Sequence, residues 1–554
     1  MRKTLFTACL IIASAMQAQV LYVNNSNGSY QAIDTKLNEE VTFDSDQQLI
    51  RFLMNDGTAS RFATAKVKNI TTASSGATEL TYDLNPKVAF DASDTENYNE
   101  IVETIITDEL DDESGDFVEN YEPERTIIIT FSENSVKTSS LPSDITATIE
   151  GGHIVINSTR VNVAYRVTGK CSNGSLKIYS TKKFQLIAQN FNITNSTGPA
   201  INIQCGKTIY FTLPKGTTNT LCDGAVYNAP TIAADGTEED QKGTLFSEGQ
   251  VIFNGEGTLN VTSLGGHGIC SDDYIRIRSG NINIINAAKD GFRTKEKFVV
   301  GRTATAAPAI NINATNNGID CSEGTLTIEA GKLDIKSGSE AIKVEYEEAV
   351  PDPKVVPDAI IKGGYIKIAT TGEKSSAIKV TRNYTQSGGI IQATVDGNGS
   401  KIINCDGAVA FSDGKVTGFA NGTIATDTTS AGGIKCNGNL EITGGTIALE
   451  CNGKGSKGIN CDGDVNVAGG DVTLIATGEN YTDIADDKKS RGITANSITV
   501  NGGKIVAKAH DNAMTAIAGI TLNEGTVNAY SEASDALNLE ATQSGGWLLT
   551  KDAE

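Results

Sequence analysis

The sequence of 554 residues contains very few histidines and tryptophans. Its three histidines are His153, His267 and His510, its one tryptophan is Trp547, and aromatic residues make up only 6% of the chain. So few imidazole groups argue against a metal site built on histidine. The shortage of aromatic rings argues against a sugar-binding β-sandwich, which usually offers a flat tryptophan or tyrosine platform to its ligand.

Long apolar runs are also lacking, except at the start of the chain. A basic end, Met1–Lys3, is followed by a short apolar run and then by small residues, which predicts a secretory signal peptide over residues 1–18. This run is too short to span a bilayer. Cys9 lies inside the run and not at its end, which argues against a lipid anchor. We therefore expect an exported protein without membrane insertion, either secreted, periplasmic or held at the cell surface.

Positive charge and paired cysteine motifs are scarce as well. The chain has 46 Lys and Arg against 67 Asp and Glu, a net charge of −21, which argues against nucleic acid or an anionic membrane as a partner. The acidity fits a protein that holds divalent cations, although it also serves solubility alone. The ten cysteines show neither a CxxC motif nor zinc spacing. Without Cys9 of the leader an odd number is left, so not all of them can pair.

A short sequence unit recurs through most of the chain. It consists of a Gly-Ile corner, a short strand with alternating apolar residues, a Gly-Gly-x turn and a second alternating strand. Copies begin at Gly268, Gly318, Gly433, Gly458 and Gly492, with variants at Gly291, Ala341, Ala377, Ala516 and Ala536. The period is roughly 20 to 36 residues and most often about 25, which is typical of a solenoid.

One such unit cannot bury its own apolar face. Glycine supplies the positive φ of the turn, and stacking of the units at about 4.8 Å buries the apolar faces in one continuous core. Helical periodicity is nearly absent. The sequence therefore predicts an all-β fold, a right-handed parallel β-helix solenoid with a small N-terminal β module.

Composition divides the chain into four predicted parts. They are the signal peptide (1–18), the small N-terminal β module (19–75), an acidic lead-in segment (76–125) and the parallel β-helix domain (126–554). The acidic stretch Asp108–Asp116 lacks EF-hand spacing and is interpreted as a solvated loop. The last residues, Trp547–Thr550, resemble an unfinished coil without a cap, which indicates either an atypical cap or a fragment of a longer chain.

An ordered series of short motifs is more specific than the repeat itself. The motifs are Gly198–Ile203, Leu213–Gly224, Phe246–Gly249, Gly255–Val261, His267–Asp273 and Lys289–Arg293. This series resembles the family of exported carbohydrate-binding β-helix proteins first described from a cellulose-degrading clostridium, over roughly residues 85–545. The N-terminal module resembles, more weakly, a segment common in exported proteins of Bacteroidetes.

The resemblance implies a right-handed parallel β-helix related to pectate lyases. It also implies bound calcium and affinity for cellulose or for acidic sugar polymers such as polygalacturonate, without demonstrated lyase activity. The family tends to place Asp-Gly-Ile at each coil. This sequence keeps the aspartate at Asp290 and Asp535 and replaces it by His267, Asn317, Glu340 and Arg491.

Four aspartates on neighbouring coils form the candidate calcium site. They are Asp272, Asp273, Asp290 and Asp320. Calcium takes six to eight hard oxygen ligands, which adjacent coils can present together. The alternative is that these side chains cap turns through hydrogen bonds to the backbone.

The residue after each corner isoleucine is predicted to form a ladder across the coils. Its members are Arg293, Asp320, Lys343, Lys379, Asn404, Lys435 and Asn460. In register, Lys343 and Lys379 lie within about 5 Å of each other, which is tolerable if an anion bridges them. Arg382 and two tyrosines lie a few residues further along the same coils. The candidate ligand-binding residues for an acidic sugar chain are therefore Arg293, Lys343, Tyr346, Lys379, Arg382 and Tyr384. The alternative is a solvated charge ladder, paired by Asp320 and Glu345.

Two further features belong to the same corner. Long connections at 345–358, near 424–432 and at 479–490 lie close to it, and insertions on a solenoid tend to gather on a functional side. Two residues after the isoleucine, cysteine exchanges with valine, which marks an apolar environment and predicts a ladder of buried, inert thiols. That ladder contains Cys321, Val344, Val380, Cys405, Cys436 and Cys461.

These observations favour a non-catalytic protein that binds polysaccharide with the help of calcium. No catalytic residue is assigned. One alternative is a calcium-dependent polysaccharide lyase, in which Lys343 or Lys379 beside Asp320 would act as the base. The other is an adhesive or structural surface protein whose stack of coils is only a spacer.

Overall fold

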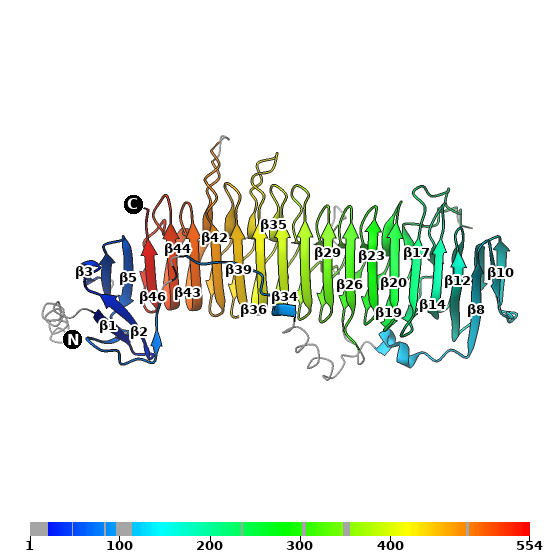
Figure 1. Ribbon diagram of the computed structural model, residues 1–554, viewed down its shortest axis with the longest axis horizontal. Coiled ribbons are helices and arrows are strands. Elements are labelled where there is room, and N and C mark those ends of the chain that lie inside the picture. Colours follow the sequence, from blue (N-terminus) through cyan, green and yellow to red (C-terminus); the bar gives the residue numbers. More distant parts are fainter. Residues whose placement is uncertain are drawn as a thin grey trace. The chain divides into compact units, whose positions relative to one another are not determined.

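The computed structural model describes residues 20–46, 48–81, 83, 85–95, 114–233, 236–301, 306–346, 355–482 and 487–553. The predicted signal peptide and residues 108–113 of the acidic stretch lie outside the described residues. The described chain is dominated by β-strands (Figure 1). It divides into two compact units, one of residues 90–407 and one of residues 1–89 with 408–554.

In the unit of residues 90–407, each strand from β15 to β30 pairs in parallel with the strand three positions later. This pairing makes three strands per coil and three parallel sheets. The first sheet carries the Gly-Ile corners and contains β15 (Ile201–Gln204), β18 (Gly243–Ser247), β21 (His267–Ser271), β24 (Phe292–Thr294), β27 (Ile319–Cys321), β30 (Ile342–Val344), β33 (Ile378–Val380) and β35 (Lys401–Cys405). The predicted parallel β-helix is confirmed.

The other two sheets of this unit follow the same order of coils. The second contains β16 (Ile209–Leu213), β19 (Val251–Gly255), β22 (Tyr274–Ile277), β25 (Lys297–Val300), β28 (Leu326–Ile328) and β31 (Ala359–Ile361). The third contains β17 (Thr218–Cys222), β20 (Thr258–Ser263), β23 (Asn281–Ala287), β26 (Ala309–Ala314), β29 (Lys332–Ser337) and β32 (Tyr365–Thr370). The long strand β34 (Tyr384–Val395) continues both sheets.

The core of this unit consists of apolar side chains stacked in register from coil to coil. Ile319, Ile342 and Ile378 are direct neighbours on the first sheet and are almost fully buried. The predicted cysteine–valine ladder is also confirmed, because Cys321, Val344, Val380 and Cys405 are partners in that order. Burial raises the pKa of Cys321 to about 12, which makes its thiol unreactive, as expected for a core position.

Two hairpins cover the first coil of this unit. Strand β8 (Arg125–Ser132) pairs in parallel with β12 (Val163–Cys171), and β11 (His153–Ser158) with β13 (Ser175–Ser180). Their outer neighbours, β9 (Ser135–Thr138) and β10 (Ile145–Glu150), are antiparallel to β8 and β11. The strand β14 (Phe184–Thr194) then leads into the regular stack. Such a change of direction ends the parallel pairing at this edge.

A short segment before the first coil packs against the outside of the second sheet. It holds the 3-10 helices η1 (Ser114–Asp116) and η2 (Val118–Asn120), and its Tyr121 contacts Tyr210 in a buried cluster. The carboxylate of Asp116 pairs with Arg276 at 2.6 Å, and both are buried. The interpretation of the acidic stretch as a solvated loop is therefore wrong for Asp116, because this carboxylate neutralises an arginine on β22.

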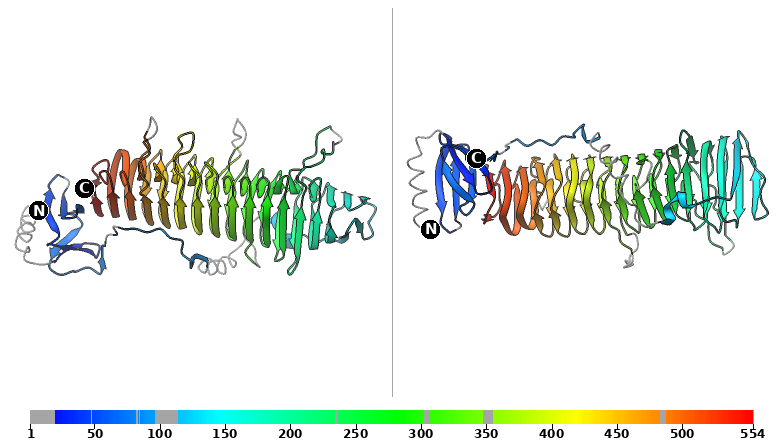
Figure 2. Two further views of the ribbon diagram at one scale, coloured as in Figure 1. Left: turned by 45° about the horizontal axis from the view of Figure 1, so that its top comes forward. Right: turned by 90° about the horizontal axis from the view of Figure 1, so that it is seen from below.

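The C-terminal part of the other unit is also built of stacked coils (Figure 2). Its strands are β36 (Val409–Ala420), β37 (Gly432–Cys436), β38 (Leu440–Ile442), β39 (Thr446–Cys451), β40 (Lys457–Cys461), β41 (Val465–Val467), β42 (Asp471–Ala476), β43 (Arg491–Ala509), β44 (Met514–Ser531), β45 (Thr542–Gln543) and β46 (Trp547–Lys551). These strands pair with one another in parallel, coil upon coil.

The N-terminal residues of this unit form two small groups of strands. One is a four-stranded sheet in the order β6 (Val67–Thr71), β1 (Val20–Asn25), β2 (Ser29–Asp34) and β7 (Thr78–Glu79). The other is an antiparallel meander of β3 (Asn38–Asp44), β4 (Leu49–Met54) and β5 (Thr58–Ala63). We call these two groups together the N-terminal module.

The N-terminal module covers the last coil. Strand β5 pairs antiparallel with β46, which places Phe62 opposite Trp547. Both residues belong to a buried cluster that also contains Phe52, Tyr530 and Leu549. The last coil therefore has an atypical cap, which is one of the two explanations that the sequence leaves open. Its cap comes from the opposite end of the sequence, where no local pattern near Trp547 could indicate it.

In the part of the chain that the structure describes, no helix has the length and apolar character that a membrane span requires.

Candidate functional site

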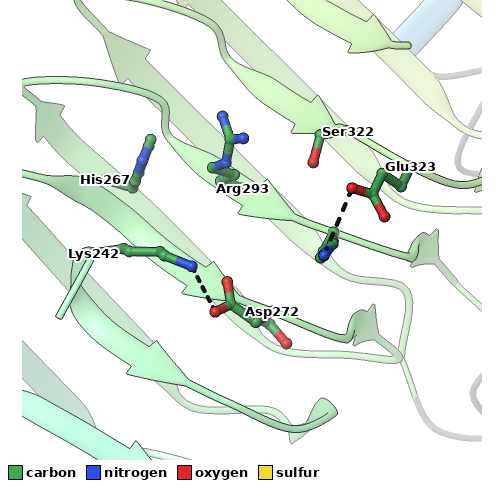
Figure 3. A pocket seen from close by; sticks show the side chains of 8 residues that line it. Lys242, His267, Asp272, Arg293, Ser322 and Glu323 are labelled. Carbon is green, nitrogen blue, oxygen red and sulfur yellow. Dashed lines mark hydrogen bonds and ion pairs between the residues drawn. The ribbon is translucent and has the colours of Figure 1, made fainter. Parts of the chain in front are cut away.

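A polar pocket lies where strands β21, β24 and β27 of the first sheet end. Its volume is about 380 Å³, near the lower end of the range for small-molecule sites. Each of these strands buries one large corner residue, Ile269, Phe292 or Ile319. Asp272, Lys295 and Ser322 come directly after the three strands and line the pocket. The lining residues come from successive coils and are Lys242, His267, Ser271, Asp272, Arg293, Lys295, Ser322 and Glu323 (Figure 3).

Lys242 is the central cation at this pocket. Its ammonium group lies 2.6 Å from the carboxylate of Asp272 and 2.8 Å from that of Asp240. Burial works against the charge of this lysine, but the hydrogen bonds to Asp240 and Asp272 outweigh it, so the pKa of Lys242 is raised. The pocket therefore carries a firmly protonated lysine held between two acids.

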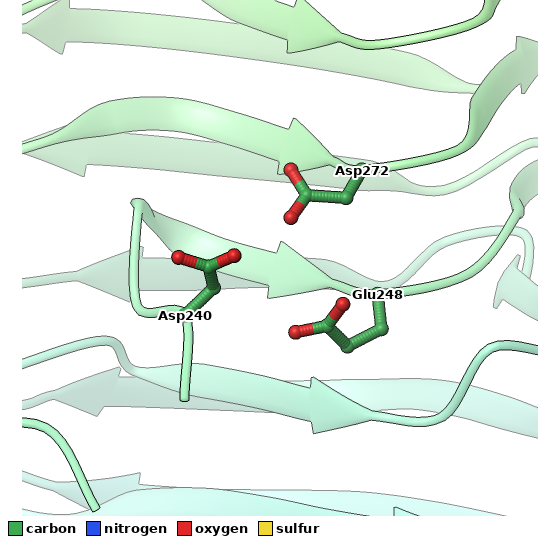
Figure 4. A group of neighbouring side chains, drawn as sticks. All are labelled: Asp240, Glu248 and Asp272. Atoms are coloured by element: carbon green, nitrogen blue, oxygen red, sulfur yellow. The ribbon is translucent and has the colours of Figure 1, made fainter. Parts of the chain in front are cut away.

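The acids around Lys242 form a carboxylate triad of Asp240, Glu248 and Asp272 (Figure 4). One oxygen of each lies within 4.8 Å of the others. Burial raises the pKa of Glu248, and the charges of Asp272 and Asp240 raise it further. Burial also raises the pKa of Asp272, although Lys242 opposes this shift. Three crowded carboxylates are hard oxygen ligands, so this triad can bind a metal ion.

The four aspartates predicted as metal ligands do not gather around one point. Asp272 belongs to the triad. Asp273 faces Glu296 instead, and burial together with the charge and hydrogen bond of Glu296 raises the pKa of Asp273 to about 6. Asp240 was missed because it lies in the long connection before β18, outside the repeat. Glu248 was missed although it directly follows β18, the place that Asp272 holds after β21 on the next coil. The acidic run Glu238–Asp240 in that connection was the available signal.

Asp290 and Asp320 are held by cations in a neighbouring network. The carboxylate of Asp290 lies 3.0 Å from Nδ1 of His267. Arg293 lies 3.3 Å from Asp320 and 3.9 Å from Asp290, and so joins the two acids. Burial would raise the pKa of Asp290, but the contact with His267, the backbone N–H of Asn317 and the charge of Arg293 lower it below its ordinary value. These two aspartates therefore serve an ion-pair network in the described structure.

The predicted charge ladder is confirmed in its register. Arg293, Asp320, Lys343, Lys379 and Asn404 are partners in that order on consecutive coils. In the other unit, Lys435 is the partner of Asn460.

The like charges of Lys343 and Lys379 are bridged by a carboxylate of the chain itself. Glu345 forms ion pairs with Lys343 and, at 3.3 Å, with Lys379. Burial opposes the charge of Lys343, but Asp320 and Glu345 outweigh it, so its pKa is raised. Burial likewise opposes the charge of Glu345, yet the two lysines lower its pKa. The anion that the ladder requires is thus supplied within the protein.

The remaining candidate ligand-binding residues differ in exposure. Tyr346 is half-buried, and Arg382 is half-exposed and pairs with Asp358 at 3.2 Å. Tyr384 is fully buried, and its hydroxyl donates a hydrogen bond to Gln386 at 2.7 Å. Its partner in register is Ala359, another buried position. The ring of Tyr384 therefore points into the core and does not face a ligand, because the alternation at the start of β34 places it inward.

Fold and site together define a parallel β-helix protein with a charged, polar coil edge. Residues 150–480 and 419–536 match the family described as carbohydrate-binding domain-containing protein. The first match alone covers more than half of the chain, and this chain belongs to that family.

Two known proteins are similar to parts of this chain. A carbohydrate-binding domain-containing protein of Acetivibrio thermocellus is 25% identical over 122 residues, which are 22% of this chain. The chain spans 41% of the length of that relative. A solved structure of the polysaccharide lyase-like protein from C. thermocellum, a gadolinium derivative, is 21% identical with a TM-score of 0.36. That match covers 52% of this chain and 96% of the other.

Proposed function

We propose that this protein binds polysaccharide without cleaving it, and that it does so outside the cytoplasm. The proposed ligand is an acidic sugar polymer, with a cellulose-like glycan as the neutral counterpart, and calcium assists binding. Membership in a carbohydrate-binding family supports the ligand class. One observation carries the preference for an acidic polymer: Arg293, Lys343 and Lys379 lie on one ladder of the first sheet, in register.

The spacing of the coils suits a linear polymer. Neighbouring rungs lie about 4.8 Å apart, and the ladder offers cations on three of four consecutive rungs, with Asp320 on the rung between Arg293 and Lys343. Each cation has a carboxylate partner already, such as Asp320 for Arg293 and Glu345 for Lys379. A uronate carboxylate competes for these cations by exchange. The side chains of Arg293 and Lys343 are only 27% and 16% exposed in their ion pairs, so a single rung offers the polymer little. Affinity arises from several rungs that bind one chain together.

The acidic triad gives calcium a place in this proposal. A divalent ion among Asp240, Glu248 and Asp272 replaces the ammonium group of Lys242, whose side chain is 37% exposed. Calcium takes six to eight oxygen ligands, more than three carboxylates supply when each offers one oxygen. The open ligand positions are filled by water and by a carboxylate of the polymer. The ion thus links an acidic protein to an acidic ligand.

The glycan hypothesis is tested by native electrophoresis through a polygalacturonate gel, with calcium or with a chelator, followed by staining of the polymer. We expect retardation that depends on calcium and leaves the polymer intact. The double variant Lys343→Ala/Lys379→Ala is expected to lose several-fold in retardation. The matched control is Lys504→Ala, which changes an exposed lysine of β43. Unretarded migration in both gels contradicts binding of this acidic polymer, and a parallel gel with a soluble cellulose derivative then separates a neutral ligand from a spacer.

A cleared zone along the protein band would replace this proposal by a lyase. Lyase chemistry requires a lysine that gives up its proton near neutral pH, which demands a lowered pKa. The pKa of Lys343 is instead raised by Asp320 and Glu345 against the effect of burial. This electrostatic environment supports binding over proton abstraction at Lys343.

The calcium site is tested by titration calorimetry with calcium alone. We expect the variant Asp272→Asn to bind calcium at least about tenfold more weakly, a difference of about 1.4 kcal/mol. The control Asp471→Asn removes an exposed carboxylate of β42 and should leave the affinity unchanged. Equal affinities of wild type and Asp272→Asn would rule out the triad as the site, even if the protein still binds the polymer.

A further inference from the structure

Two of the nine cysteines in the described residues touch each other. Cys436 in β37 and Cys461 in β40 have their sulfur atoms 3.0 Å apart. Both side chains are almost fully buried. In the cysteine–valine ladder of the other unit, by contrast, Cys321 and Cys405 have valine partners, Val344 and Val380. The pair of Cys436 and Cys461 therefore differs chemically from that ladder.

The backbone at this pair suits a covalent link. Cys436 and Cys461 are direct partners in register on neighbouring parallel strands, and so are Ile434 with Ile459 and Lys435 with Asn460. Neighbouring strands are about 4.8 Å apart, and disulfides join residues whose Cα atoms are about 4.4 to 6.8 Å apart. Because both side chains are on the same face of the sheet, the two sulfurs meet without a shift of the backbone.

The electrostatic environment favours a thiolate at one of the two sulfurs. The thiol of Cys436 hydrogen-bonds to Cys461 and lowers its pKa, which outweighs burial. The backbone N–H groups of Gly463 and Leu440 and the charge of Lys435 act in the same direction. Elsewhere burial dominates, and it raises the pKa of Cys451 to about 12. A thiolate is the species that attacks a disulfide oxidant.

We propose that Cys436 and Cys461 form a disulfide that joins two neighbouring coils. The thiolate of Cys461 attacks a disulfide oxidant, either glutathione disulfide or a protein disulfide, and one thiol of the oxidant leaves. Cys436 then gives up its proton and attacks the sulfur of Cys461, and the second thiol of the oxidant leaves. Two electrons and two protons pass to the oxidant in total. Because both sulfurs are buried in the finished stack, the exchange takes place during assembly, when β37 and β40 are paired but the coils around them are not yet complete.

The disulfide would stabilise the part of the stack that carries two long connections. Residues 421–431 lead into β37, and residues 477–490 lead from β42 into β43. Each connection holds an isolated antiparallel bridge, Ile424 with Ser430 and Tyr481 with Lys488. A cross-link between residues 25 positions apart fixes the coil between these two connections. The proposal does not depend on glycan or calcium binding.

The test is a peptide map of the full chain, refolded with glutathione disulfide or with a reductant and alkylated before digestion. Trypsin cuts after Lys435, Lys454 and Lys457, so Cys436 and Cys461 fall on different peptides, 436–454 and 458–488. We expect these peptides to be linked only after oxidative refolding. Cys451 shares the first peptide, so the variant Cys451→Ala should keep the link, and Cys436→Ala should abolish it.

A second measurement uses the unchanged sequence and so needs no variant to fold. The oxidised protein should unfold at a temperature about 5 °C higher than the reduced protein. In Cys405→Ala, which removes a buried cysteine outside the pair, oxidation should produce the same rise. Full alkylation of both cysteines after oxidative refolding into a folded protein, or a link of either one to another cysteine, overturns the proposal.

Discussion

The variant Phe62→Ala tests whether the N-terminal module stabilises the end of the solenoid. Phe62 is 1% exposed and lies opposite Trp547 where β5 meets β46. Its ring also packs edge-on against Phe52, with centroids 6.2 Å apart. Truncation to alanine therefore opens a cavity among rings that belong to both the module and the last coil.

The expected loss of stability is large but local. Replacing a buried phenylalanine by alanine costs about 3 to 5 kcal/mol. With a slope of about 2 to 3 kcal/mol per molar urea, this loss moves the unfolding midpoint of the affected region down by about 1 to 2.5 M. In a solenoid each coil contacts only its neighbours, so distant coils should keep their stability.

The chain offers a fluorescent reporter at this interface, because Trp547 is its only tryptophan. We propose to follow urea unfolding by tryptophan fluorescence, which reports on the cap, and by far-UV circular dichroism, which reports on all coils. The fluorescence midpoint should fall by the amount given above, and the main dichroism transition should move much less. The control Ile517→Ala changes a side chain that is 82% exposed and should alter neither signal.

Two outcomes would refute this reasoning about the cap. If the fluorescence midpoint of Phe62→Ala equals that of the wild type, the module does not stabilise the last coil. If both signals shift together by the same amount, the stack unfolds as one cooperative body and the cap has no local role.

The remaining predictions concern a tight turn and a buried carboxylate beside the pocket. Gly324→Ala should lower the free energy of unfolding by about 3 kcal/mol, because a Cβ atom at this position would overlap the carbonyl oxygen of Glu296. The control Gly206→Ala has open space around the added Cβ atom and should be neutral in the same thermal melt. The pKa of Asp290 is lower in the folded protein than in the unfolded chain, where it is about 3.9. The ionised carboxylate therefore stabilises the folded protein fully above about pH 3.9, and this stabilisation is lost as the pH falls through the lowered pKa. Asp290→Asn should therefore melt well below the wild type at pH 6 and approach it near pH 2, and parallel curves would contradict the assignment.

The coil register could be predicted because the repeat carries it. The Gly-Ile corner by itself aligns Arg293, Asp320, Lys343 and Lys379, and the strand pairing agrees with that alignment. Each coil buries the isoleucine of its corner, so the next residue points to the opposite face of the strand. The stacked apolar residues on one face therefore align the charged residues on the other.

The contents of the candidate site could be predicted only in part. Asp272 follows a corner strand and was found, whereas Asp240 lies in a long connection without periodicity. The inward orientation of Tyr384 depends on how the chain enters β34, which a two-residue alternation does not fix when a turn precedes it. The pairing of β5 with β46 joins distant parts of the sequence, and no local pattern encodes such a contact.

That pairing has a consequence for the timing of folding. The side chain of Gln543 donates a hydrogen bond to the carbonyl of Arg61, a residue 482 positions earlier in the chain. At a synthesis rate of about 5 to 20 residues per second, the N-terminal module waits about 25 to 100 s for the strand it covers. During that time the edge of β5 is open to other partners, and a chain cut short before β46 would leave it open permanently. The N-terminal module can therefore complete its cap only when the last coil has been made.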